Sequence, residues 1–227
     1  MSTTLGFSRE HAAVNSAGPE AAVRHLATRE AWIRDLIDPL RAHDLTVPSA
    51  LPGWSIAHVI VHLARNADSH RRRIAAAASG EVIDQYVGGA EGRAHDIEDG
   101  VGRDAAAIID DAIDASHALD SAWRTVEPSH WDIESRDLGG TVRALRTLPY
   151  RRLPEVEVHA VDLGVGATPG DWSQPFVDRF LPLLRATVAQ RLPAGTAAPV
   201  IDLDPRDELW WLFGRGRFPG LPELAPL

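Results

Sequence analysis

The sequence predicts a mainly α fold of the α+β class, in which an antiparallel four-helix bundle is followed by a small C-terminal α/β domain. In the first two thirds of the chain, apolar residues recur every three or four positions, as they do on one face of a helix. After Gly164 the pattern changes to short segments separated by proline and glycine. We therefore expect a bundle over residues 1–168 and a second domain over residues 169–227.

The bundle helices are recognisable from their ends as well as from their apolar faces. We expect them at about 19–38, 54–78, 103–125 and 155–163. Pro39 stops the first helix, Ser55 is a candidate N-terminal cap for the second, and Gly164 ends the fourth. The polar, glycine-rich stretch 80–102 is expected to be a connection.

Two shorter regions are expected to contain strands. Residues 131–143 alternate loosely around Asp137–Gly140, which favours a hairpin. In the C-terminal domain we expect a helix over 176–192, a strand over 199–203 and a helix over 207–213. The tail from Gly214 is rich in glycine and proline and is expected to be irregular.

The composition excludes several kinds of chemistry and partner. The chain has no cysteine, so it holds no disulfide, no cysteine-ligated zinc and no protein thiol nucleophile. A net charge of −9 argues against nucleic acid as a partner. The N-terminus shows no signal peptide and no stretch is apolar enough to span a membrane, so we expect a cytoplasmic protein, either a monomer or a small homo-oligomer.

Two helices carry residues that can bind a metal. Glu155 and His159 are four positions apart and share one helix face, where they can close on one metal ion; a surface ion pair is the alternative. Asp162 lies three positions further along the same stripe. His62 lies within an otherwise apolar stretch, either as a core histidine bonded to a backbone carbonyl or as a metal ligand.

His58 competes with His62 for such a role, because these two histidines also have i,i+4 spacing. Asn66 lies one turn beyond His62 on the same face. Combined, His62, Glu155 and His159 would make a zinc site of two histidines and one carboxylate, drawn from facing helices. Its fourth position would be open to water or substrate, as in catalytic zinc sites.

Four segments carry a wider resemblance. They are Leu51–Asp68 (LPGWSIAHVIVHLARNAD), Tyr86–Arg93 (YVGGAEGR), Glu155–Gly164 (EVEVHAVDLG) and Phe213–Gly216 (FGRG). In this order they resemble the mycothiol-dependent maleylpyruvate isomerases of the DinB-like helical-bundle superfamily, with the first and third similar to the two metal motifs of that family. The similarity covers nearly the whole chain.

The resemblance implies that His62, Glu155 and His159 are the zinc ligands and that His58 is not one. It also implies that Arg215, from the C-terminal domain, binds a substrate carboxylate and takes part in catalysis.

Three further residues have less specific assignments. Arg93 matches a family arginine and is expected to bind an anionic group, with a structural salt bridge as the alternative. Asn66 is assigned to substrate or cofactor binding, and Asp162 to orienting His159, with a simple hydrogen bond at the helix end as the alternative for Asp162.

The implied activity is a zinc- and thiol-dependent cis–trans isomerisation of maleylpyruvate, or of a similar cis enoyl dicarboxylate, to fumarylpyruvate. A thiolate adds to the alkene, the new single bond rotates, and elimination gives the trans product. Zinc would favour the thiolate form of mycothiol or another low-molecular-weight thiol. Because the chain has no cysteine, this thiol must come from outside.

Two other functions stay open at this point. A thiol S-transferase on the same scaffold would add the thiol to an electrophile without eliminating it, and a non-catalytic module would bind a metal or small molecule only. Pro154, directly before Glu155, departs from the family pattern, because proline must start, kink or break a helix. The C-terminal domain is also short.

Overall fold

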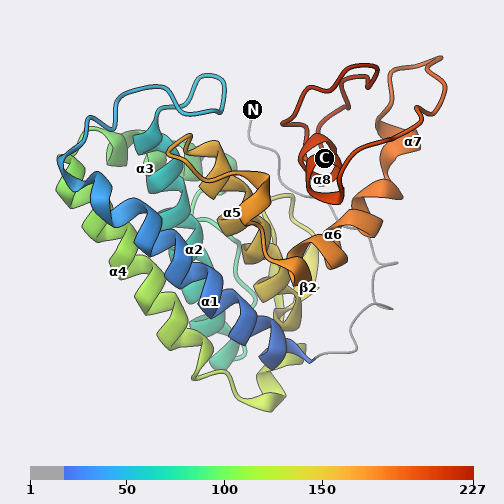
Figure 1. Cartoon of the computed structure of the whole chain (residues 1–227). Coiled ribbons are helices and arrows are strands. Elements are labelled where there is room, and N and C mark those ends of the chain that lie inside the picture. The colour runs from blue at the N-terminus through green and yellow to red at the C-terminus, as the bar shows by residue number, and fades with distance from the viewer. Residues whose placement is uncertain (1–17) are drawn as a thin grey trace. The chain divides into compact units, whose positions relative to one another are not determined.

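The computed structural model describes residues 18–227 (Figure 1). The described chain divides into two compact units: the bundle unit, which ends at Gly166, and the C-terminal unit, Ala167–Leu227. We propose that these units are the two domains expected on either side of residue 168. The residues on which the expectation of no signal peptide rests lie outside the described part. From residue 18 onward, no helix combines the length and the apolar character needed to cross a membrane.

Four long helices form the bundle unit: α1 (Pro19–Ile37), α2 (Ile56–Ala78), α4 (Ala105–Trp123) and α5 (Leu148–Asp162). α1 and α2 each pack against both α4 and α5, so the four helices enclose one core. α2 and α5 are antiparallel, because His62 meets Glu155 while Asn66, one turn later, meets Arg152. α1 and α5 run in one direction and α2 and α4 in the other (Figure 1). The four-helix bundle expected from the sequence is confirmed.

The connection predicted over residues 80–102 is wrong, because it contains a further helix, α3 (Gly89–Val101). This segment carries the chain back along the bundle, so that α4 can run parallel to α2 (Figure 1). Its buried residues are Arg93, Ile97 and Gly100, too few to give a clear apolar periodicity. A Cβ added at Gly100 would lie 2.5 Å from Cγ1 of Val61 on α2. Close packing against α2 therefore stabilises a helix whose glycines disfavour it.

The predicted hairpin is confirmed. β1 (Glu134–Arg136) pairs antiparallel with β2 (Val142–Ala144). The helix that follows, α5, begins at Leu148, earlier than expected, and Pro149 lies in its first turn, where a missing N–H costs nothing. α5 then continues through Pro154. Pro154 lacks the N–H that would donate to the carbonyl of Tyr150, so the ladder loses one hydrogen bond while the helix continues on both sides.

The C-terminal unit contains α6 (Gln174–Arg185), α7 (Val188–Arg191) and α8 (Pro205–Leu212). The strand predicted over 199–203 is wrong: residues 167–227 are helical or irregular, so the α/β description of this unit is corrected to α. Val200 is 92% exposed, and a lone apolar segment with no neighbouring strand does not form a sheet. The core of the unit is aromatic, with Phe176 and Phe213 stacked and Trp172 packed edge-on against both.

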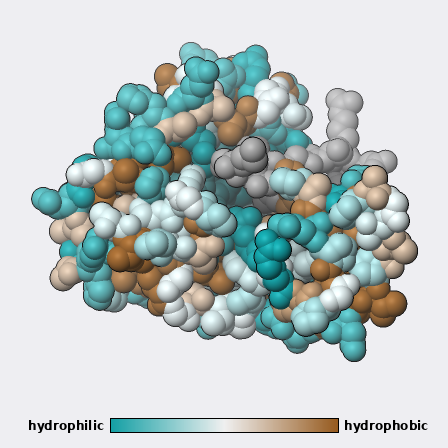
Figure 2. All heavy atoms as spheres, turned by 90° about the horizontal axis from the view of Figure 1, so that it is seen from above, coloured by the Kyte–Doolittle hydropathy of each residue, from teal (hydrophilic) through white to brown (hydrophobic). Residues whose placement is uncertain are grey.

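The bundle core combines apolar and polar side chains. Leu26, Ile60, Ile109, Leu119 and Val156 are fully buried, which stabilises the fold by about 1.5–3 kcal/mol for each side chain of this kind. On the face shown in Figure 2, hydrophobic residues form small patches between hydrophilic ones. Several charged side chains are buried inside the bundle as well, among them Glu30, Arg93, Arg152 and Asp162.

Candidate metal centre

His62 is placed by the start of α2. The Ser55 hydroxyl accepts from the backbone N–H of His58, and the His58 ring accepts at Nδ1 from the backbone N–H of Ser55, at 3.2 Å. This reciprocal cap fixes the first turn of α2. The cap occupies His58, and His62, one turn later, contacts Glu155 on α5. His62 is 3% exposed and packs edge-on against Trp54, with ring centroids 5.7 Å apart.

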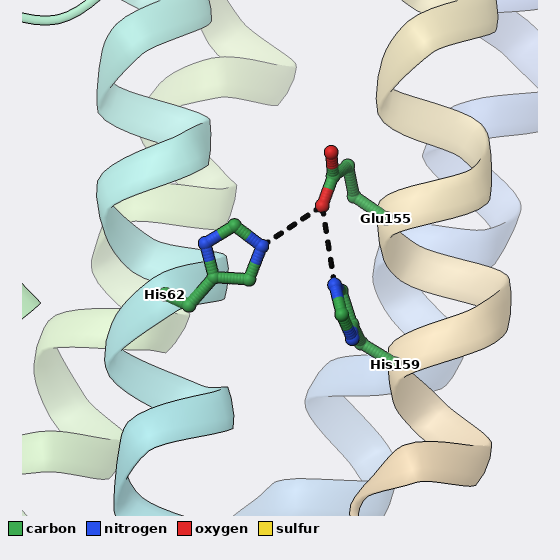
Figure 3. A group of neighbouring side chains, drawn as sticks. All are labelled: His62, Glu155 and His159. Atoms are coloured by element: carbon green, nitrogen blue, oxygen red, sulfur yellow. Dashed lines mark hydrogen bonds and ion pairs between the residues drawn. The ribbon is translucent and has the colours of Figure 1, made fainter. Parts of the chain in front are cut away.

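The three predicted ligands come together between α2 and α5 (Figure 3). Glu155 Oε2 lies 2.9 Å from His62 Nε2 and 3.3 Å from His159 Nε2. The candidate ligand atoms all lie within 4.8 Å of one another, and the two imidazole rings are nearly perpendicular at 88°. Among residues 18–227, His62, Glu155 and His159 are the one group of three or more histidine and acidic side chains close enough to hold a single metal ion.

The donor set fits a zinc ion. Zinc bonds to histidine nitrogen and carboxylate oxygen at about 2.0–2.2 Å, so neighbouring ligand atoms in a tetrahedron lie about 3.3 Å apart. The distances from Glu155 to the two histidines, 2.9 and 3.3 Å, are close to this spacing. Two nitrogens and one carboxylate leave one coordination position for an outside ligand.

Asp162 supports His159 as an orienting residue would. Its carboxylate, 1% exposed, accepts a hydrogen bond from His159 Nδ1 at 2.9 Å. A proton on Nδ1 leaves Nε2, which faces Glu155 and His62, as the ligating nitrogen. Burial lowers the pKa of His159, but the hydrogen bonds to Asp162 and Glu155 outweigh it, so that this pKa is raised above its usual 6.5.

Asp162 accepts a hydrogen bond from Nδ1 of His159, whereas Arg93 donates one to Nδ1 of His62. Its guanidinium lies 2.9 Å from His62 Nδ1, and because arginine only donates, this nitrogen carries no proton here. The proton of the neutral ring is then on Nε2, where it is donated to Glu155 Oε2. A neutral ring that bound a metal at Nε2 would carry its proton on Nδ1, where it could not accept from Arg93.

The charges of the site follow from burial and hydrogen bonding. Burial is the main cause that lowers the pKa of His62 to about 4, against the opposing effect of Glu155, so His62 is neutral. Burial alone would raise the pKa of Glu155. The hydrogen bonds from His159 and His62 outweigh burial and hold this pKa well below its usual value. The cluster thus presents an ionised carboxylate and the neutral imidazole of His62, while a divalent cation would have to displace the proton of His159, whose pKa is raised.

Two other predicted residues are placed differently. Asn66 is 1% exposed; its Nδ2 donates to the Tyr86 hydroxyl at 3.3 Å and its Oδ1 accepts from Arg152 at 3.0 Å. Arg215 belongs to the C-terminal unit, where its Nη1 donates to the Phe213 carbonyl at 3.1 Å. The ligand-binding roles of both residues stay predictions.

Sequence reasoning missed three residues around the cluster. Trp54 packs on His62, Tyr86 contacts Asn66, and Arg152 bonds to the neighbours of His62. Trp54 directly precedes Ser55, the N-cap of α2, and this position in the sequence could have indicated that Trp54 lies near the start of the helix that carries His62. Arg152 is three positions from Glu155, but nothing in the sequence shows that a charged residue there is 2% exposed.

Comparisons with known proteins found a matching family profile and similar crystal structures. A profile of the "Mycothiol maleylpyruvate isomerase N-terminal domain" matches residues 23–164. A crystal structure of the mycothiol-dependent maleylpyruvate isomerase superposes with a TM-score of 0.80 at 24% identity, covering 92% of this chain and 97% of that one. A structure of a histidine-to-alanine mutant of that enzyme gives 0.81 at 23% identity, with the same coverage.

At these identities the two superpositions show the shared fold. No functionally curated protein matched the chain. The profile covers more than half of the residues and includes the whole metal cluster, so this chain belongs to the mycothiol maleylpyruvate isomerase N-terminal domain family.

Proposed function

We propose that this protein is a zinc- and mycothiol-dependent isomerase that converts maleylpyruvate, or a similar cis enoyl dicarboxylate, to fumarylpyruvate. The observation that carries the proposal is the cluster of His62, Glu155 and His159 inside the segment that matches the family profile. In the overall reaction a thiolate adds to the conjugated alkene, the resulting single bond rotates, and elimination returns the thiol unchanged with the trans alkene. No atom is gained or lost.

The residues of the cluster would hold the metal. His62, Glu155 and His159 supply three ligands, and Asp162 orients His159 through its Nδ1 proton. When bound, the zinc ion would lower the pKa of a thiol at the open position and so favour the nucleophilic thiolate.

Arginine side chains would bind the anionic substrate. Arg93 lies next to His62 and, once displaced from Nδ1, has its donors free for a carboxylate. We propose that Arg215 also binds a substrate carboxylate. Its guanidinium would in addition stabilise the negative charge that develops on the substrate when the thiolate adds. The guanidinium of Arg93 also lies 6.0 Å from the Trp54 ring and 5.8 Å from the Tyr86 ring, within the range of a cation–π contact.

An assay with maleylpyruvate and several thiols tests the proposal. We expect formation of fumarylpyruvate that depends on mycothiol and on a divalent metal, with no net consumption of thiol. Net loss of thiol without a trans product would show an S-transferase instead. Stoichiometric metal binding without any thiol-dependent turnover would show a binding module.

A further inference from the structure

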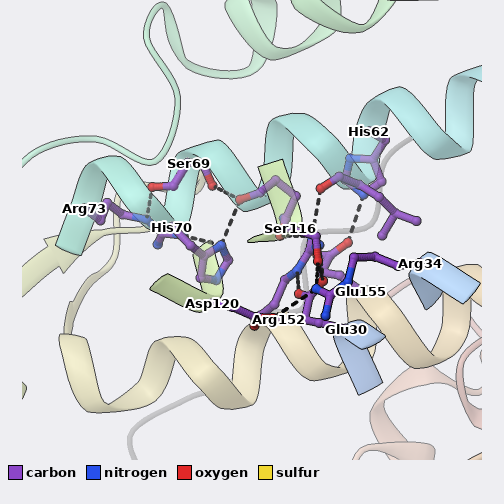
Figure 4. A network of polar contacts seen from close by, with 12 residues as sticks. Glu30, Arg34, His62, Ser69, His70, Arg73, Ser116, Asp120, Arg152 and Glu155 are labelled. Carbon is purple, nitrogen blue, oxygen red and sulfur yellow. Dashed lines mark hydrogen bonds and ion pairs between the residues drawn. The ribbon is translucent and has the colours of Figure 1, made fainter. Parts of the chain in front are cut away.

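A network of buried polar residues lies beside the metal cluster (Figure 4). Its members come from all four bundle helices: Glu30 on α1, Asn66 on α2, Ser116 on α4 and Arg152 on α5. Each of these residues is between 0% and 3% exposed. Charged groups at this depth are costly unless they are paired, so the network has to be explained by what it holds together.

Arg152 is the centre of this network. Its Nε donates to Glu30 Oε1 at 2.7 Å, and its Nη1 donates to the Leu63 carbonyl at 2.9 Å and to Asn66 Oδ1 at 3.0 Å. One guanidinium on α5 is therefore bonded to α1 and, at two points, to α2. Because the guanidinium is planar and its donors point in fixed directions, these bonds define the position of α5 along α2.

Glu30 is held in turn from the other side. The Ser116 hydroxyl donates to Glu30 Oε2 at 2.6 Å, and Arg34 donates to the same hydroxyl at 2.6 Å. Glu30 thus presents a fixed acceptor to Arg152.

The bonds of Arg152 attach next to the metal ligands on both helices. On α2 they attach to Leu63, the neighbour of His62, and to Asn66, one turn beyond it. On α5, Arg152 precedes Glu155 by three residues, which is slightly less than one turn. A shift of α5 by one residue, about 1.5 Å, would break these bonds and would also separate Glu155 from His62.

We propose that Arg152 is a positioning residue for the metal centre: together with Glu30 it sets the register of α5 against α2 and so keeps Glu155 and His159 opposite His62. Arg152 supplies no ligand atom to the cluster. The inference rests on the proposed metal-dependent function, because it concerns the geometry of the same three ligands. Ligand sets have to be held within about 0.5 Å of their working geometry by supporting residues, and the bonds of Arg152 to α1 and α2 supply such support.

The test compares metal affinity with stability in three variants. Arg152→Met removes the guanidinium but leaves Glu30 buried and unpaired, so it lowers both stability and Zn²⁺ affinity. The double variant Glu30→Gln with Arg152→Met removes the unpaired charge, and we expect stability to recover while Zn²⁺ binding stays at least tenfold weaker than in the wild type. Glu157→Gln is the matched control, because it breaks the buried ion pair between α5 and Arg29 on α1 and leaves the bonds of Arg152 intact.

Zn²⁺ affinity is measured by competition with a chromophoric chelator on folded protein, and the absorption spectrum of the Co²⁺-substituted protein reports ligand geometry. A weakened affinity and altered spectrum in the double variant, with wild-type values in Glu157→Gln, support the inference. Wild-type affinity in the double variant, or an equal loss in Glu157→Gln, overturns it. If the wild type itself binds no divalent ion, the proposed function fails and this inference with it.

Discussion

Replacing Asp162 by asparagine changes one property of the site. The amide has the size of the carboxylate and can still accept from His159 Nδ1, but it carries no charge. Asp162 is 1% exposed and accepts this hydrogen bond at 2.9 Å, so solvent screens the interaction little. A hydrogen bond to a charged group contributes about 1.5–3 kcal/mol and a neutral one about 0.5–1.5 kcal/mol.

The difference of about 1–1.5 kcal/mol corresponds to about tenfold in the dissociation constant of the metal. We therefore expect Asp162→Asn to bind Zn²⁺ about tenfold more weakly, and Asp162→Ala up to about a hundredfold, the range typical of such orienting residues. Chelator competition at fixed pH measures both constants.

The matched control is Glu157→Gln. Glu157 is a buried carboxylate on the same helix, but its ion-pair partner is Arg29, at 2.9 Å, rather than a metal ligand. This variant should lose stability and keep its Zn²⁺ affinity. An unchanged affinity in Asp162→Asn, or the same loss in Glu157→Gln, would refute the reasoning that Asp162 acts through His159.

Four more predictions follow from the geometry. Because the pKa of His159 is raised, a bound proton competes with the metal, so Zn²⁺ affinity should rise about tenfold per pH unit below that pKa and level off above it. Titration calorimetry in buffers of different ionisation enthalpy should show that metal binding releases one proton at lower pH. The absence of proton release at every pH would contradict the assignment of His159 as a ligand. Arg93→Met should strengthen Zn²⁺ binding, because it removes a nearby positive charge and the group that donates to His62 Nδ1. The same variant should raise KM for the dicarboxylate. Weaker metal binding would mean that Arg93 supports the bound metal. Arg215→Met should lower kcat/KM about tenfold or more and leave Zn²⁺ affinity unchanged, and wild-type kinetics would remove Arg215 from the site. Gly100→Ala should destabilise the fold by about 1–3 kcal/mol in thermal unfolding, because the new Cβ would meet Val61 at 2.5 Å, whereas Gly102→Ala, with open space around it, should be nearly neutral.

The bundle helices were accessible from the sequence because their signals are local. The apolar period of α1 and α2, the cap at Ser55 and the stop at Gly164 all act within a few residues. α3 was not accessible, because its stability comes from the close approach of Gly100 to Val61, a contact between segments far apart in the chain. The strand predicted around Val200 failed for a related reason: its apolar residues have no partner strand.

The candidate site divides in the same way. The i,i+4 spacing of Glu155 and His159 is visible in the sequence, and the family resemblance selects His62 over His58. The structure places the three side chains together and adds a reason for the choice, since His58 serves the cap of α2. The burial of Arg152 and its bonds across three helices depend on tertiary packing, which no short pattern encodes.

The central claim is that His62, Glu155 and His159 bind one metal ion whose open position accepts a thiol. The most direct measurement is a titration of the Co²⁺-substituted protein with mycothiol, followed by absorption spectroscopy. We expect one Co²⁺ per chain and a thiolate-to-metal charge-transfer band that saturates with thiol and is lost in His62→Ala. A spectrum that does not respond to thiol at saturating concentration, or the same band in His62→Ala, would contradict the account.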